Sequence, residues 1–122
     1  MDRLFAFSGA ILAAIAVSLG AFGAHTLKDR LSSADLATFE VGVRYQMYHA
    51  LALFIVAWAV TRWPSNMLHV SGWLFILGTI IFSGSLYVLV LSGHRWLGAV
   101  TPLGGFSLIV GWVMLAWTGL RA

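Results

Sequence analysis

The stretch GVRYQMYHALALF, residues 42–54, decides the fold, because it sets polar side chains directly against an apolar run. That run, Ala50 to Val60, rises about 1.5 Å per residue and cannot alone cross a hydrocarbon core of roughly 30 Å. Counting back about 20 residues from Trp63 puts the start of the span near Arg44. Part of the polar stretch must then lie at or inside the membrane boundary, facing other helices or a water-filled pocket.

The composition assigns the chain to the membrane proteins. Of its 122 residues, 61% are hydrophobic and 9% are charged, and the mean hydropathy is +0.94. A soluble domain of this length could not bury so many apolar side chains. The net charge of +3 arises from 7 basic and 4 acidic residues that are spread thinly, so no basic patch indicates a nucleic-acid partner. The absence of cysteine excludes disulfides and thiolate chemistry.

Four apolar segments are long enough to cross a bilayer. The sequence therefore predicts an all-α integral membrane four-helix bundle, a single four-span domain over residues 1–122, with both termini on one side. Basic residues are shared evenly between the two faces, so charge does not decide which face is cytoplasmic. The spans are expected near Leu4 to Ala24, Arg44 to Thr61, Leu68 to Leu91, and Thr101 to Leu120.

A short interfacial helix is predicted between spans one and two. Ser32 followed by Asp35 resembles a capping box, and Leu36, Phe39 and Val43 recur at helical spacing. A helix should therefore start near Ser32 and run along the interface into span two. The alternative is a solvated loop.

The segment from Thr101 to Gly105 admits two interpretations. Thr101 is the N-cap and Pro102 the first helical residue, or the helix begins near Trp96 and kinks at Pro102. In the first case a helix N-terminus recessed below the membrane surface offers free N–H groups to an anionic group.

Small residues four apart predict close helix contacts and self-association. In so alanine-rich a helix, such pairs also arise easily by chance. The pairs are Gly9 with Ala13, Ala10 with Ala14, and Gly20 with Ala24.

Several motifs resemble those of a known family. They are GAFGAHTL from Gly20, ATFEVGVRYQMYHALAL from Ala37, FSGSLYVL from Phe82, and TPLGG from Thr101 together with Gly111-Trp112. These motifs are similar to the YgdD-like family of small bacterial membrane proteins of unknown function, which has distant relatives in eukaryotes. The resemblance implies a four-helix, multi-pass protein of the bacterial inner (cell) membrane, and it supplies no catalytic residue.

Antiparallel spans would bring most of the polar motifs to one membrane face. We expect Glu40, Arg44, Tyr48 and His49 to form a buried cluster with His25 at its rim, and Glu40 to neutralise Arg44 one turn away. The full candidate buried polar cluster is His25, Glu40, Arg44, Tyr45, Gln46, Tyr48, His49, Ser83, Ser85, Thr101, Gly104 and Gly105.

Three functions compete. The first is a structural or lipid-interacting membrane protein whose partners are membrane lipids and further copies of itself. The second is a channel or carrier for a small ion or solute, although the opposite halves of the spans lack a polar lining. The third is an enzyme or cofactor protein, for instance one with His25 and His49 as haem axial ligands or one that uses Glu40, Tyr48 and His49 for acid–base work. No HExxH, GxSxG or phosphate-loop spacing occurs, so no catalytic, metal or cofactor residue is assigned.

Overall fold

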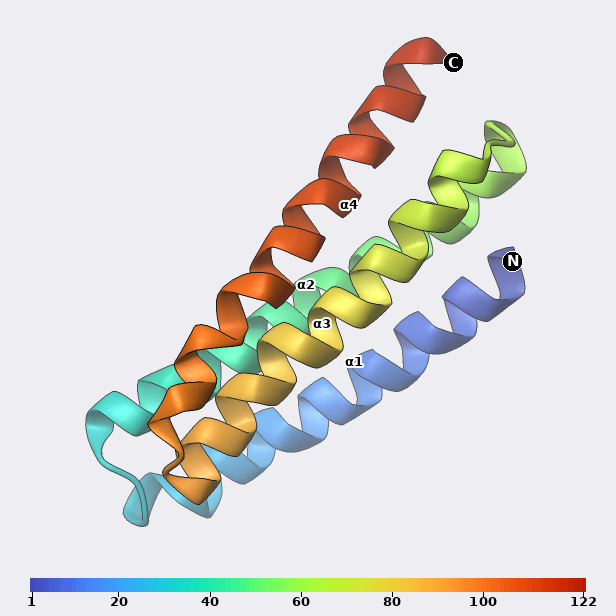
Figure 1. The fold of residues 1–122 in the computed structure, drawn as a ribbon. Helices are drawn as coiled ribbons and strands as arrows, with labels where there is room; N and C mark the ends of the chain where they lie inside the picture. The colour runs from blue at the N-terminus through green and yellow to red at the C-terminus, as the bar shows by residue number, and fades with distance from the viewer.

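Four long α-helices make up almost the whole chain in the computed structural model of residues 1–122 (Figure 1). Each is long and apolar enough to cross a membrane, so the predicted all-α, four-span architecture is confirmed. Two short 3₁₀ segments, η1 (Leu27–Asp29) and η2 (Arg95–Ala99), lie in the connections. The long helices are α1 (Asp2–His25), α2 (Ser33–Arg62), α3 (Asn66–Ser92) and α4 (Thr101–Arg121).

The helices run back and forth, so successive connections lie at opposite ends of the bundle. Figure 1 shows both chain termini and the α2–α3 turn at one end, and η1 with the α3–α4 connection at the other. We call these the terminal end and the loop end. The prediction that the two termini share a side is therefore confirmed.

Helix α2 is longer than a membrane span because it begins well before the apolar run. Its N-cap is Ser32, whose Oγ accepts the backbone N–H of Asp35 at 3.1 Å, as the sequence predicts. The helix has 30 residues, and at about 1.5 Å each they extend well beyond a core of roughly 30 Å. The predicted short interfacial helix is thus not a separate element. It is the first turns of α2, continuous with the span, and the only helical piece between α1 and α2 is η1.

Helices α2 and α3 form the centre of the bundle. Of the apolar window in each, 44% is buried, against 17% in α1 and 22% in α4. Helix α1 packs on α2, and α4 packs on α3. The two flanking helices therefore leave most of their surface to lipid. The largest side chains buried between the helices are Phe5, Phe39, Phe75, Leu53 and Leu68.

Glycine allows two close approaches of helix backbones. A Cβ on Gly104 would lie 2.4 Å from the backbone nitrogen of Phe82, so α4 can meet α3 here only without a side chain. A Cβ on Gly9 would lie 2.7 Å from the carbonyl oxygen of Ala50. Gly9 and Gly20 both face α2 of the same chain, so their small size is used inside the protomer and not between copies.

The beginning of α4 decides between the two interpretations of the Thr101 segment. The helix starts at Thr101 with Pro102 in its first turn, and η2 precedes it in place of a longer kinked helix. The expected N-cap is wrong: Val100 occupies that position, without a side-chain cap. The N–H of Leu103 is bonded to the carbonyl of Val100 at 3.0 Å. Because a 3₁₀ turn leads into the helix and uses this donor, the expected recessed anion site is not formed as predicted.

Candidate functional site

The predicted polar cluster is split between the surface and the interior of the bundle. Its charged residues and two of its aromatic residues are exposed: His25, Glu40, Arg44, Tyr45 and Tyr48. Gln46, His49, Ser83, Ser85 and Gly104 are buried, and Thr101 and Gly105 are half-buried. The structure therefore buries the glutamine, one histidine and the serines, and it leaves the charged residues, the other histidine and two tyrosines exposed.

Glu40 and Arg44 do not form the predicted buried ion pair. Both side chains are exposed, and neither takes part in either of the two ion pairs of the structure. The two residues precede the apolar run of α2, and long charged side chains near the end of a span can extend toward the membrane surface, where water solvates the charge. A neutralising partner is unnecessary at that position.

The buried polar groups bond to one another and to backbone carbonyls. Gln46 joins three helices, because its Nε2 donates to the carbonyl of Leu12 in α1 at 2.8 Å and its Oε1 accepts from the hydroxyl of Tyr87 in α3 at 2.7 Å. The hydroxyl of Ser83 donates to the carbonyl of Gly42 at 2.7 Å. Each such bond contributes little net energy, but together they fix how the helices align.

The same pattern continues between α3 and α4. The hydroxyls of Ser85 and Thr101 lie 2.6 Å apart, and Ser71 donates to the carbonyl of Gly111 at 2.8 Å. Only Oγ1 of Thr79 is buried without a partner. The polar interior is thus closed on itself and offers no continuous polar lining of the kind a channel requires.

His49 is the buried residue through which α2 meets α4. The indole Nε1–H of Trp112 donates to His49 Nε2 at 3.0 Å. An indole nitrogen can only donate, so Nε2 carries no proton and Nδ1 does; Nδ1–H then donates to the carbonyl of Tyr45 at 2.7 Å. With both ring nitrogens engaged and His25 exposed at the end of α1, the geometry does not favour the haem hypothesis. No group of three His, Asp or Glu side chains is placed to hold a metal ion.

A groove opens beside this bond, between α2 and α4. Its volume is about 560 Å³, and six of its eight lining residues are hydrophobic. No charged residue lines it. We call it the aromatic groove, and its lining residues are Tyr45, Tyr48, His49, Phe82, Gly105, Leu108, Ile109 and Trp112.

Stacked and tilted rings make the wall of the aromatic groove. The ring centroids of Tyr45 and Phe82 lie 5.0 Å apart. Those of Trp112 and Phe75 lie 4.9 Å apart, and Phe75 is fully buried. The hydroxyls of Tyr45 and Tyr48 are bonded to no protein group, and both residues are exposed. The groove therefore has an apolar floor and a polar rim.

The polar rim lies toward the loop end of the bundle. Arg44 is one helical turn before Tyr48 on α2, so the two side chains lie on neighbouring parts of one face. Arg44 lies five residues before His49 on α2, about 7.5 Å of helix rise nearer the loop end, and His49 bonds to Trp112 at the floor of the groove. The guanidinium of Arg44 therefore lies on the loop-end side of the groove floor.

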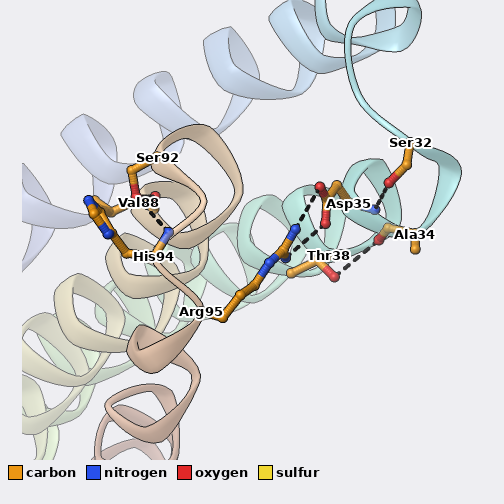
Figure 2. A network of polar contacts seen from close by, with 8 residues as sticks. All are labelled: Ser32, Ala34, Asp35, Thr38, Val88, Ser92, His94 and Arg95. Carbon is orange, nitrogen blue, oxygen red and sulfur yellow. Dashed lines mark hydrogen bonds and ion pairs between the residues drawn. The ribbon is translucent and has the colours of Figure 1, made fainter.

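A bidentate ion pair joins the two connections at the loop end (Figure 2). The two terminal nitrogens of Arg95 donate to the two carboxylate oxygens of Asp35 at 3.0 and 3.1 Å, which links η2 to the first turn of α2. The hydrogen bond from Arg95 holds the pKa of Asp35 below its ordinary value, and the same bond raises the pKa of Arg95. Since Arg95 is well exposed to solvent, the pair positions η2 against α2 more than it stabilises the fold.

The sequence analysis predicted neither the contact of Trp112 with His49 nor the ion pair between Asp35 and Arg95. Trp112 falls at helical spacing from Gly105 and Leu108, and this spacing could have placed it on the same face of α4 as the predicted glycine. Nothing in the sequence joins Asp35 to Arg95, which are 60 residues apart.

Four apolar helices around a closed polar interior define a multi-pass helical membrane protein. The profile of the family described as "Protein of unknown function (DUF423)" matches residues 19–105. The chain is 44% identical over 120 residues to UPF0382 membrane protein YwdK of Bacillus subtilis (strain 168), and the match covers 98% of each chain. The chain belongs to this DUF423/UPF0382 family of bacterial membrane proteins of unknown function.

Staphylococcal relatives are as similar. The chain is 45% identical over 113 residues to UPF0382 membrane protein SH2409 of Staphylococcus haemolyticus (strain JCSC1435) and 47% identical over 113 residues to UPF0382 membrane protein SAUSA300_0565 of Staphylococcus aureus (strain USA300). Each match covers 93% of this chain and 92% of the relative. No solved structure matches the chain.

Proposed function

We propose that the protein is a small lipid-binding bundle whose aromatic groove holds a hydrocarbon chain of a membrane phospholipid. The observation that carries the proposal is the groove itself: about 560 Å³, lined mostly by hydrophobic side chains and by no charge, between two membrane-spanning helices. Ligand sites of this size are typically apolar, with a few polar groups that fix orientation. Phospholipid chains are the apolar molecules that surround such a groove in a bilayer.

The rim supports a phospholipid rather than a free hydrocarbon. Arg44 and the tyrosines Tyr45 and Tyr48 are the exposed polar residues of α2 beside the groove, and Arg44 has no carboxylate partner. A guanidinium and phenol hydroxyls donate hydrogen bonds to phosphate oxygens. Tyrosine is also a residue that favours the membrane–water interface.

Native mass spectrometry of the protein purified in a mild detergent tests the proposal. We expect one retained phospholipid per protomer. Replacing Arg44 by Gln should lower the affinity about fivefold, because one arginine near a membrane surface contributes about 1 kcal/mol to binding an anionic lipid group. Wild-type protein that carries no lipid under conditions that keep the bundle folded would contradict the proposal.

We also infer that the protein self-associates, and the support is one pair of exposed alanines on α1. Gly9 and Gly20 are used inside the protomer, but Ala10 and Ala14 remain exposed on the outer face of α1. A pair of small residues four apart on a lipid-facing surface lets another helix approach closely. Light scattering in mild detergent should show a dimer or larger species, and replacing Ala10 by Phe should dissociate it. A homogeneous monomer across detergents and lipid would contradict this inference.

We infer a closer relationship, within the family named above, to the YgdD-like proteins. The motifs GAFGAHTL and TPLGG support this relationship, and it implies no particular activity.

A further inference from the structure

A second cavity opens at the terminal end, between the α2–α3 turn and the end of α4. Its volume is about 460 Å³. We call it the arginine pocket because two arginines line it, one from each side. The lining residues that matter here are Arg62, Trp63, Met67, Trp117, Thr118 and Arg121.

The two arginines of this pocket have no ion-pair or hydrogen-bond partner in the protein. Neither Arg62 nor Arg121 is in an ion pair, and neither guanidinium donates a hydrogen bond. No Asp or Glu side chain lines the pocket, although Ala122 does. A main-chain carboxylate at Ala122 would offset one of the two positive charges and leave the other. The pocket is thus cationic and holds unused donors that suit a phosphate group.

Tryptophans fix the height of the pocket in the membrane. The Cζ of Arg121 lies 5.8 Å from the centre of the Trp117 ring, a cation–π contact that holds the guanidinium over the indole. On the other side, a Cβ on Gly119 of α4 would lie 3.6 Å from the ring of Trp63. Tryptophan is enriched at the membrane–water boundary. The residues of the arginine pocket are therefore of the kind that proteins place at the membrane–water boundary, where lipid phosphates lie.

We propose that the arginine pocket binds the headgroup of an anionic phospholipid in the leaflet at the terminal end, with Arg62 and Arg121 on its phosphate. Basic pockets between membrane-spanning helices commonly take anionic headgroups. The site lies at the opposite end of the bundle from the rim of the aromatic groove, so it does not depend on that groove holding a lipid. Two arginines line this pocket, whereas no charged residue lines the aromatic groove, so the arginine pocket should discriminate more strongly for headgroup charge.

The test compares phosphatidylglycerol with phosphatidylcholine of identical acyl chains, titrated into detergent-solubilised full-length protein and followed by native mass spectrometry. Wild-type protein should prefer phosphatidylglycerol. Each arginine replaced by Gln should reduce this preference about fivefold, so that Arg62→Gln with Arg121→Gln together abolish most of it. Raising the ionic strength should weaken it in the same direction.

Arg3→Gln is the matched control, because Arg3 is exposed at the same end but does not line the pocket. It should change the preference less than twofold. Equal preference for both lipids in the wild type, or an equal loss in the Arg3 variant, would overturn the proposal. Full competition by inorganic phosphate at millimolar concentration would also overturn it, because the site would then bind the free anion. Variants of the aromatic groove change the binding of both lipids together and not their ratio, which separates the two proposals.

Discussion

Trp112 donates its indole N–H to Nε2 of His49 at 3.0 Å, and this bond joins α4 to α2 at the floor of the aromatic groove. Helix α4 packs mainly on α3, so the bond is a specific polar link between α4 and the helix across the groove. This hydrogen bond also sets which imidazole nitrogen is protonated, because only an unprotonated Nε2 can accept the indole N–H. The geometry of the groove therefore depends on a neutral His49.

Replacing Trp112 by Phe should leave His49 Nε2 without its donor, while Nδ1–H stays bonded to the carbonyl of Tyr45. The wild-type ¹⁵N spectrum of His49 should show one protonated nitrogen, Nδ1, and one unprotonated nitrogen, Nε2, and in the variant the Nε2 resonance should shift while Nδ1 stays protonated. We expect a stability loss of about 1 kcal/mol for the lost hydrogen bond. Trp96→Phe is the control, since Trp96 is 67% exposed and donates no bond. An unchanged His49 spectrum in Trp112→Phe would contradict the assignment.

Two adjacent glycines should respond differently to alanine. A Cβ at position 104 would lie 2.4 Å from the backbone nitrogen of Phe82, whereas a Cβ at position 105 would lie 3.6 Å from the Phe82 ring. Gly104→Ala should therefore push α4 from α3 and cost about 1–3 kcal/mol, while Gly105→Ala should cost little. Unfolding in mixed micelles measures both. Equal stability of the two variants would show that α3 and α4 do not approach this closely.

The ion pair at the loop end should be sensitive to acid. Because the Arg95 bond lowers the folded-state pKa of Asp35, the pair contributes stability above the unfolded pKa of about 3.9. That contribution is lost as pH falls through the lowered folded-state pKa. A ¹³C titration of the Asp35 carboxyl should give a value below the ordinary one, and Arg95→Gln should raise it. Identical titrations of the two proteins would contradict the pairing.

Gln46 and Tyr87 should be energetically coupled. A double-mutant cycle with Gln46→Leu, Tyr87→Phe and both changes removes their 2.7 Å hydrogen bond in steps. We expect a coupling energy of about 0.6 kcal/mol, the average for such bonds in membrane proteins, and less than about 1.7. Strict additivity within error would mean that the two side chains do not interact in the membrane.

Much of the fold could be predicted because membrane spans leave a strong local signal. The apolar runs and the Ser32–Asp35 capping pattern give the four helices, the beginning of α2 and the side of both termini. For the Thr101 segment, the sequence left two interpretations of where the last helix begins. The choice between them depends on how η2 leads into α4, which no local sequence pattern predicts.

The candidate site was predicted less well because helical spacing gives the direction of a side chain but not its neighbour. Gln46 and His49 are buried as expected, whereas Glu40 and Arg44 are exposed on the part of α2 that precedes its apolar run. The depth of a long helix cannot be read from a count of 20 apolar residues. The contact of Trp112 with His49 joins residues 63 apart, so only the packing of α4 brings them together.

The most direct test of the account fills the aromatic groove. Gly105→Leu places a side chain among the groove residues, and Gly84→Leu is the matched control, because a Cβ at Gly84 of α3 meets nothing within 4 Å. Native mass spectrometry should show one phospholipid per protomer in the wild type and in Gly84→Leu, and none in Gly105→Leu, with all three proteins equally folded by circular dichroism. Retention of the same lipid by folded Gly105→Leu would contradict the claim that this groove is the lipid site.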